Sequence, residues 1–365
     1  MKSNFRKLIQ IIAMMMIGIM TLTACATSEK PSNKNATTTV EKEAPAEAPK
    51  EVVEAPAFEF EKVTLRFGST SAEGSIIVET MNDFSKRVAE KTSGNVTVEV
   101  FPASQLGGVK EMTQSLQVGA LDMSMTQPAS LVDMGIKEMS VIVLPYIFRD
   151  FEHRWNVLES EIGDSLLEKV DGGNVKLKGF GYFKDGARNF FTAKNKPIRK
   201  LEDIAGMKLR VQPYEMDSDM TVALGASPTP TAFAELYSAI QSGVVDGAEQ
   251  PTAGYYNGKF YEVTKYFTLD EHTYNTLVVL FSELSWNKLQ PEVQEVLAES
   301  WTEATETTKS KIIETEEEML TKLEAEGVEV IRLTDRDKWV EAMKPVYDKH
   351  GVGFEELIAK IQEMK

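Results

Sequence analysis

The chain has 365 residues, one cysteine and a formal net charge of −16, with 56 Asp and Glu against 40 Lys and Arg. Such an acidic balance excludes nucleic acid as a partner, because phosphate binding needs a basic face. A single cysteine excludes a disulfide framework within the chain, and the length exceeds what one hydrophobic core usually spans, so two domains are expected.

The first 25 residues have the features of an export signal. Three cations precede an apolar run, 8–22, that is too short and too closely followed by polar sequence to span a membrane. The run ends in LTAC, which is similar to a bacterial lipobox, so we expect Cys25 to be lipidated. A buried or reactive thiol at Cys25 is the weaker alternative. Residues 1–25 are therefore predicted to be a lipoprotein signal peptide, with the exported protein anchored at the outer face of the cytoplasmic membrane.

Residues 26–57 consist almost entirely of Thr, Asn, Pro, Ala, Glu and Lys. Such a segment buries too little apolar surface to offset the entropy lost on ordering. We predict a disordered tether, stiffened by its prolines.

Beyond the tether, hydrophobic periodicity predicts alternating strands and helices. The expected elements are a strand at 63–67, a helix at 77–88, a strand at 96–100, a helix at 109–118, a strand at 121–126 and an apolar run at 141–146. This rhythm predicts a mainly parallel sheet covered by helices.

The second half repeats the rhythm with new elements. The expected elements are strands at 179–183 and 208–211, helices at 216–225 and 231–243, a long helix from Pro291, a strand at 328–333 and terminal helices. The long helix carries charge on most faces and keeps no heptad. It therefore favours a solvated surface helix over a coiled-coil partner site.

Two arginines stand beside apolar, strand-like sequence: Arg188 in GYFKDGARNFF and Arg210 in AGMKLRVQP. A guanidinium donates two parallel hydrogen bonds to a carboxylate and stays charged at any working pH. The pair indicates a local site for a small anion, and surface or ion-paired arginines are the alternative. Because ligands of α/β proteins lie beyond strand ends and in clefts between domains, an exported two-lobed chain suggests a cleft-closing receptor.

The sequence gives little support to an enzyme. His153, His272 and His350 lie far apart along the chain, and no cysteine besides Cys25 is available. The segment GFGYFKDG lacks the third glycine of a GxGxxG phosphate loop. We therefore expect no catalysis, no cofactor and no metal.

Several motifs in this order resemble a known family. They are FPASQLGG, VGALDM, VLPYIFRDFEHRWNVL, DGARNFF, KPIRKLEDIAGMKLRV, LGASPTPTAFAELYSAIQSGVVDGAEQP and FYEVTKYFTLDEH. Residues 60–365 resemble the solute-binding proteins of tripartite ATP-independent periplasmic (TRAP) transporters, the dicarboxylate-receptor (DctP-like) family.

The resemblance implies an α/β fold of the two-lobed periplasmic-binding-protein type, with hinge strands and a long helix that spans both lobes. Lobe one would comprise residues 60–187 plus 276–315, and lobe two residues 188–275 plus 316–365. Ligand binding would draw the lobes together by hinge motion, and the small and large membrane subunits of the transporter would bind the closed form.

The resemblance also implies roles for individual residues. Arg210 would make a two-point salt bridge to the ligand carboxylate, with Arg188 supporting it. Gln250 stands at a position where Asn is common in the family. Because Gln is one methylene longer than Asn, the resemblance leaves open how Gln250 contacts the carboxylate. The other candidate pocket residues are Glu73, Gln127, Tyr214, Phe190 and His272. For His272, a structural hydrogen-bonding role is the preferred alternative.

The run PYIFRDFEHRWNVL and the aromatic residues around GARNFF are similar to receptors for sugar acids, especially uronates. Amide and carboxylate side chains such as Gln127 and Glu73 suit sugar hydroxyls. We therefore expect a hexuronate or related sugar acid. Val109 stands where an acidic residue is common in relatives with hydroxylated ligands, which favours a C4-dicarboxylate or 2-oxo acid receptor instead. A ligand-binding sensor module is a third possibility.

Overall fold

The computed structural model describes residues 58–365 except 173 and 194. The predicted signal peptide with Cys25 and the predicted tether lie outside the described residues. Every feature below belongs to the unit Phe60–Lys365. Among the described helices, none combines the length and the apolar character that a membrane crossing requires.

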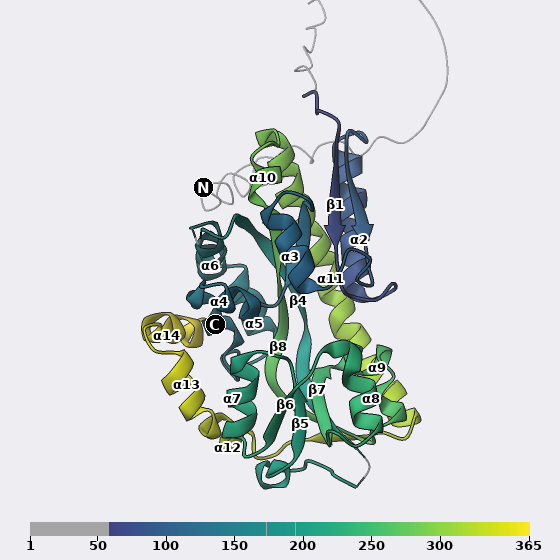
Figure 1. Ribbon diagram of the computed structural model, residues 1–365, viewed down its shortest axis with the longest axis vertical. Helices are drawn as coiled ribbons and strands as arrows, with labels where there is room; N and C mark the ends of the chain where they lie inside the picture. The colour runs from purple at the N-terminus through teal and green to yellow at the C-terminus, as the bar shows by residue number, and fades with distance from the viewer. Residues whose placement is uncertain (1–57, 173, 194) are drawn as a thin grey trace, which may run out of the picture. The chain divides into compact units, whose positions relative to one another are not determined.

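In the described residues, a mixed sheet of nine strands forms the centre of this unit (Figure 1). Its order is β2-β1-β3-β8-β4-β7-β5-β6, and β9 also pairs with β8. The strands are β1 (Val63–Gly68), β2 (Val96–Phe101), β3 (Met123–Thr126), β4 (Leu177–Thr192), β5 (Lys208–Val211), β6 (Ser227–Pro230), β7 (Gly247–Pro251), β8 (Tyr266–Ser282) and β9 (Glu329–Arg332).

The sheet is parallel only in part. β1 pairs in parallel with β2 and β3, and β5 with β6 and β7. The long strands β4 and β8 pair antiparallel with each other, and they pair antiparallel with β7 and β3 respectively. The prediction of a mainly parallel sheet is therefore wrong at its centre. The two long strands run through the sheet and connect its two parallel ends (Figure 1).

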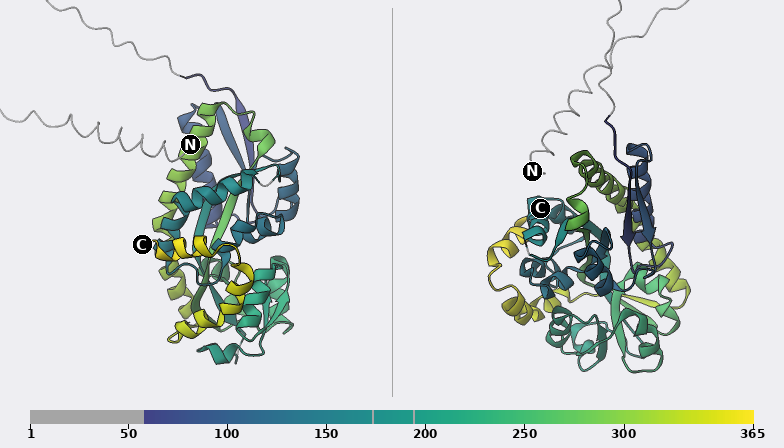
Figure 2. Two further views of the ribbon diagram at one scale, coloured as in Figure 1. Left: turned by 90° about the vertical axis from the view of Figure 1, so that its left-hand side faces the viewer. Right: turned by 45° about the horizontal axis from the view of Figure 1, so that its top comes forward.

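Helices lie on both sides of the sheet (Figure 2). The α-helices are α2 (Ile76–Lys91), α3 (Val109–Gln117), α4 (Pro128–Asp133), α5 (Phe151–Leu158), α6 (Glu161–Gly172), α7 (Glu215–Ala223), α8 (Leu236–Gln241), α9 (Thr252–Asn257), α10 (Glu283–Trp286), α11 (Pro291–Ala325), α12 (Arg336–Ala342), α13 (Lys344–His350) and α14 (Glu355–Glu363). Short 3-10 helices are η1 (Lys137–Val143), η2 (Leu201–Ile204), η3 (Phe233–Glu235) and η4 (Phe260–Glu262).

Helix α2 shows how local sequence sets these boundaries. The Ser75 side chain caps its N-terminus by accepting a hydrogen bond from the backbone N–H of Val78. Phe84 and Val88 recur at helical spacing and are buried. Gly94 then adopts a φ of +79°, which favours glycine, and the chain turns into β2.

Helix α11 connects two apolar clusters. Val293, Leu297 and Trp301 pack into the cluster that includes residues of β1, α2 and β4. Leu320 and Leu323 pack into a second cluster around α8, α9 and β9. The prediction of a solvated surface helix is therefore wrong for one face, because a widely spaced apolar stripe is hidden among many charged positions.

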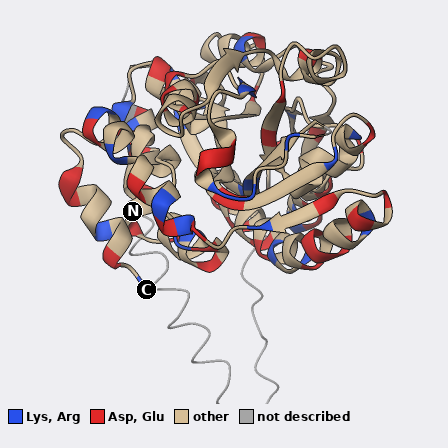
Figure 3. Cartoon of the chain, turned by 90° about the horizontal axis from the view of Figure 1, so that it is seen from below, with Lys and Arg blue, Asp and Glu red and all other residues tan. Residues whose placement is uncertain are grey.

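Charged side chains of both signs are interspersed over the outer helices (Figure 3). Pairs such as Lys86–Glu90 are exposed, and exposed pairs contribute little to stability in water. Three cations differ, because Arg154, Lys184 and Arg210 are among the largest fully buried side chains. A buried cation needs a partner or a function, and Arg210 lies close enough to Glu249 and Arg188 for their charges to act on it.

Candidate functional site

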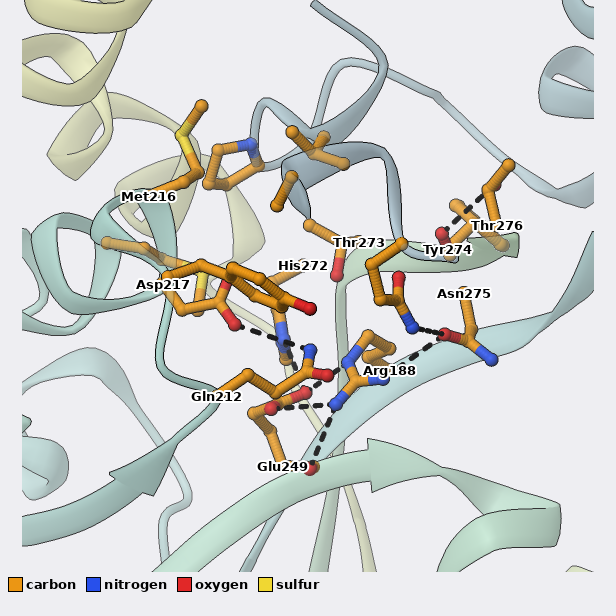
Figure 4. Close-up of a pocket in the computed structure, with 16 residues that line it drawn as sticks. Arg188, Gln212, Met216, Asp217, Glu249, His272, Thr273, Tyr274, Asn275 and Thr276 are labelled. Atoms are coloured by element: carbon orange, nitrogen blue, oxygen red, sulfur yellow. Dashed lines mark hydrogen bonds and ion pairs between the residues drawn. The ribbon is translucent and has the colours of Figure 1, made fainter. Parts of the chain in front are cut away.

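A cavity of about 30 Å³ lies against the crossing strands β4 and β8 (Figure 4). Its walls come from three directions: the β3–α4 segment with η1, the β5–α7 segment, and strands β4, β7 and β8. The polar and charged lining residues include Gln127, Arg188, Gln212, Tyr214, Asp217, Glu249, His272 and Asn275. Most of these polar and charged side chains therefore belong to the β5–α7 segment and to strands β4, β7 and β8.

Arg188 already holds a carboxylate of the protein itself. Its Nε and Nη2 donate to the two carboxylate oxygens of Glu249, with Nη2 2.8 Å from Oε1. Its Nη1 donates to Oδ1 of Asn275 at 3.2 Å. The register places Phe190 opposite Glu249, so Arg188, two residues earlier on β4, shares that face of the sheet.

Both partners of this pair are more than nine-tenths buried, with relative exposures of 7% for Arg188 and 3% for Glu249. Burial opposes ionisation, but the charge of Arg188 and hydrogen bonds nevertheless lower the pKa of Glu249 to about 2. The positive charge of Arg188 is therefore balanced within the protein.

His272 extends the same network. Its Nδ1 lies 2.7 Å from Oδ2 of Asp270, and its Nε2 lies 3.6 Å from Oε2 of Glu249. The ring stacks on Phe190 with centroids 4.7 Å apart. Burial opposes protonation, but Asp270 and Glu249 raise the pKa of His272 to about 9, so the imidazole is protonated at neutral pH.

Arg210 on β5 is a buried cation with an unused donor. Arg154 on α5 also has donors without a partner in the described residues, but its guanidinium lies over the rings of Phe151 and Tyr274. The Nε of Arg210 donates to the backbone oxygen of Thr231 at 2.9 Å, and its relative exposure is 1%. Among the described residues, its Nη1 has no hydrogen-bond partner and no carboxylate lies within ion-pair distance. Burial lowers the pKa of Arg210, and the charge of Arg188 lowers it further, against Glu249. An anion that paired with this guanidinium would relieve the cost of its desolvation.

Asp217 adds a second carboxylate to the cavity wall. It lies in the first turn of α7, and its Oδ2 accepts a hydrogen bond from Nε2 of Gln212 at 3.3 Å. Burial and the charge of Glu249 raise the pKa of Asp217 to about 7, against the opposing charges of Arg188 and His272. Unlike Glu249, it pairs with no cation in the described part of the chain.

The structure brings together four of the residues predicted for the site. Gln127, Arg188, Tyr214 and His272 all line the cavity, although they come from widely separated parts of the chain. Arg210 is buried close enough to the group for its charge to act on it. Their roles in binding a ligand stay predictions.

The other predicted residues lie outside the cavity lining. Phe190 is fully buried behind the ring of His272. Gln250 is buried on β7 next to Glu249, and adjacent strand residues point to opposite faces of a sheet. Glu73 is exposed in the turn before α2.

Val109 and the neighbour of Glu73 also lie away from the charged cavity. Val109 is half-buried at the first position of α3, away from the cavity lining. Gly74, the neighbour of Glu73, lines a second cavity of about 140 Å³ on the side of α11. The predicted pocket mouth and the charged cavity are therefore lined by different residues.

The acidic part of the site was not predicted from the sequence. Glu249 stands directly before Gln250 in VDGAEQP, and strand alternation could have placed it on the face of Arg188. Asp217 offered no such signal, because its approach to Arg188 depends on how β5 and α7 pack.

Comparison with known proteins gives the family. Residues 67–352 match the model of bacterial extracellular solute-binding protein, family 7 (DctP). The chain is 34% identical over 268 residues to the C4-dicarboxylate-binding periplasmic protein DctP of Rhodobacter capsulatus, covering 72% of this chain and 79% of that protein.

Solved structures show the same relationship. A TRAP periplasmic solute-binding protein from Pseudomonas putida F1 with bound D-glucuronate superimposes with a TM-score of 0.78 at 29% identity, covering 83% of this chain and 98% of that one. One from Xanthobacter autotrophicus Py2 with bound β-D-galacturonate gives a TM-score of 0.77 at 31% identity, covering 82% and 100%. The predicted two-lobed α/β binding-protein fold is thereby confirmed. The chain belongs to the family 7 bacterial extracellular solute-binding proteins, the DctP-type receptors of TRAP transporters.

Proposed function

We propose that this TRAP receptor captures a hexuronate or a related sugar acid and delivers it to the small and large membrane subunits of its transporter. The observation that carries the proposal is Arg210, whose buried Nη1 has no partner among the described residues. The uronates bound to the two similar structures support the sugar-acid class.

The proposed roles of the two arginines are unequal. Arg210 clamps the ligand carboxylate, since its guanidinium is desolvated and still has donors to offer. Arg188 supports the clamp, but Glu249 and Asn275 already occupy most of its donors. The Nε2 of Gln127 donates to Asn275 at 3.1 Å, which leaves its amide oxygen for a ligand hydroxyl.

The proposed pocket must open to admit a ligand. A cavity of about 30 Å³ is far smaller than the roughly 300–1,000 Å³ of typical ligand pockets. We propose that lobe one, residues 60–187 plus 276–315, and lobe two, residues 188–275 plus 316–365, move about β4, β8 and α11. The ligand contacts of Gln250 and Glu73, which lie outside the cavity lining, stay predictions.

The protein acts outside the cytoplasm, as its family does. We further propose that Cys25 carries a lipid and that residues 26–57 tether the binding unit to the membrane. Lipobox-like LTAC and the composition of the tether support this anchoring.

We propose a binding role without catalysis. His272 is protonated and lies between Asp270 and Glu249, which makes it a poor general base at neutral pH. The carboxylate of Glu249 is likewise engaged by Arg188. Because these side chains are engaged by partners within the protein, they suit binding of a ligand better than catalysis.

A C4-dicarboxylate is the second candidate ligand, because the relative from Rhodobacter capsulatus is named for that class. A 2-oxo acid also offers a carboxylate to Arg210, and a sensor module could use the same site. Calorimetric titration of the full-length protein with D-glucuronate, D-galacturonate, succinate and pyruvate separates the ligand classes. We expect a uronate to bind tightest. Tightest binding of succinate would support the dicarboxylate alternative, and no binding of any carboxylate would refute the receptor proposal.

A further inference from the structure

Building on the proposed function, we propose that Asp217 determines specificity by selecting hydroxyl-bearing monocarboxylates over dicarboxylates. The residue was not anticipated from the sequence, and it lines the cavity in which the proposed function seats the ligand.

The geometry sets Asp217 apart from the other acid of the site. Both oxygens of Glu249 accept hydrogen bonds from Arg188, so that carboxylate is engaged. Asp217 accepts one hydrogen bond from the neutral amide of Gln212, and no cation pairs with it in the described residues. Figure 4 shows its side chain directed toward Gln212 within the cavity group.

An ionised carboxylate can only accept hydrogen bonds. A sugar hydroxyl is a donor and would satisfy Asp217 directly, whereas a second carboxylate of the ligand would meet a like charge. Such repulsion acts strongly in a cavity with few polar contacts to water. Asp217 therefore favours a ligand with one carboxylate, for Arg210, and hydroxyl groups elsewhere.

The surrounding charges leave this preference intact. Arg188 on β4 and His272 on β8 face the cavity, but Arg188 is paired with Glu249 on β7 and His272 with Asp270 on its own strand. Arg210 on β5 is the remaining cation, and it is committed to the first carboxylate under the proposed function. Tyr214, which precedes α7, is neutral at working pH because burial raises its pKa to about 12. The region around Asp217 is therefore net acidic when Asp217 is ionised.

Protonation should relax the selection. Burial and Glu249 raise the pKa of Asp217 to about 7, so the carboxyl becomes neutral under mildly acidic conditions. A neutral carboxyl can donate to a second carboxylate of the ligand. We therefore expect the preference for D-glucuronate over succinate to be larger at about pH 8 than at about pH 6.3, where Asp217 is largely protonated while succinate is still mostly a dianion.

The test compares dissociation constants of the full-length protein for D-glucuronate and succinate by calorimetry. At about pH 8, Asp217→Asn should lower the ratio of affinities at least about tenfold, which corresponds to about 1.4 kcal/mol. Glu215→Gln is the matched control. It removes a charge from the same helix turn, but Glu215 is exposed and pairs with Lys349 on α13. Its ratio should stay within about twofold of the wild type.

An unchanged ratio in folded Asp217→Asn overturns the inference while leaving the receptor function in place. If that variant does not fold, the wild-type protein decides, because a ratio that is the same at both pH values also overturns it. A wild-type preference for succinate at about pH 8 does the same. Binding of neither acid refutes the proposed function itself.

Discussion

At the scale of single residues, the site is a set of buried charges that differ in how they are paired. Arg188 is matched by Glu249, and His272 by Asp270. Arg210 is buried without a carboxylate partner in the described residues. An unpaired buried cation lowers the stability of a protein. An anionic ligand that pairs with it would offset this loss, so the unpaired cation is consistent with a binding role.

The Arg188–Glu249 pair makes a stability prediction. Glu249→Gln should lower the free energy of unfolding by about 3–5 kcal/mol, because it leaves a buried guanidinium without its counter-charge. Urea denaturation of the ligand-free protein measures this. Glu329→Gln makes the same chemical change in the exposed Arg199–Glu329 pair and should leave the unfolding midpoint almost unchanged. Equal effects of the two variants would contradict the conclusion that the Arg188–Glu249 pair is buried and stabilising.

Asp217 predicts a pH-dependent difference in stability. A carboxyl whose folded-state pKa is raised from 3.8 to about 7 contributes stability below about pH 4, and that contribution is lost as the pH rises through 7. Asp217→Asn should therefore be more stable than the wild type at about pH 8, by on the order of 1 kcal/mol or more, and should lose this advantage toward about pH 4.5. Urea denaturation at both pH values measures the difference. A difference in stability that does not change with pH would contradict a raised pKa of Asp217 in the folded protein.

Sequence alone identified the cations of the site better than its acids. Arg188 and Arg210 stood out because an acidic chain placed them beside apolar strands. Glu249 and Asp217 did not, because acidic residues are common throughout this chain. Their importance depends on burial and on contacts made across the sheet, which no local pattern records.

At the scale of elements, β4, β8 and α11 connect the two ends of the molecule. Periodicity predicted α2 and the strands β1, β2, β3 and β5 closely, since that feature is local, whereas β6, β7 and β8 were not predicted. The antiparallel pairing of β4 with β8 was not predicted, because strand direction is decided by contacts between residues far apart in the chain.

Contact between β4 and α11 gives an element-scale prediction. A Cβ at Gly181 would lie 2.7 Å from Cδ1 of Trp301, whose Nε1 donates to the backbone oxygen of Tyr182. Gly181→Ala should lower the free energy of unfolding by about 1–3 kcal/mol, since the indole must move from its place. Gly186→Ala is the matched control on the same strand, because its nearest contact is Oε2 of Glu316 at 3.5 Å. Chemical denaturation that ranks the control as the more damaging variant would refute this packing argument.

At the scale of the whole molecule, a receptor must both open for its ligand and stay near its transporter. The proposed opening is supported by the small size of the cavity, and the comparisons show the receptor family. Anchoring rests on sequence alone, because Cys25 lies outside the described residues.

Cys25→Ser tests the proposed anchor. The variant should move from the membrane fraction to the soluble extracytoplasmic or culture fraction, while its affinity for the ligand stays unchanged, because residue 25 precedes the binding unit. Immunoblotting of fractionated cells, with calorimetry on the released protein, measures both. Continued membrane association of the variant would argue against lipidation at this residue.

The affinity of Arg210 variants for the ligand tests most directly whether this guanidinium clamps the ligand carboxylate. By calorimetry with D-glucuronate, Arg210→Ala should weaken binding by roughly 2–5 kcal/mol, about thirty-fold to several-thousand-fold. Arg210→Lys should restore little of this loss, because an ammonium group cannot reproduce the planar fork of a guanidinium. Near wild-type affinity in both variants would contradict the proposal that Arg210 clamps the ligand carboxylate.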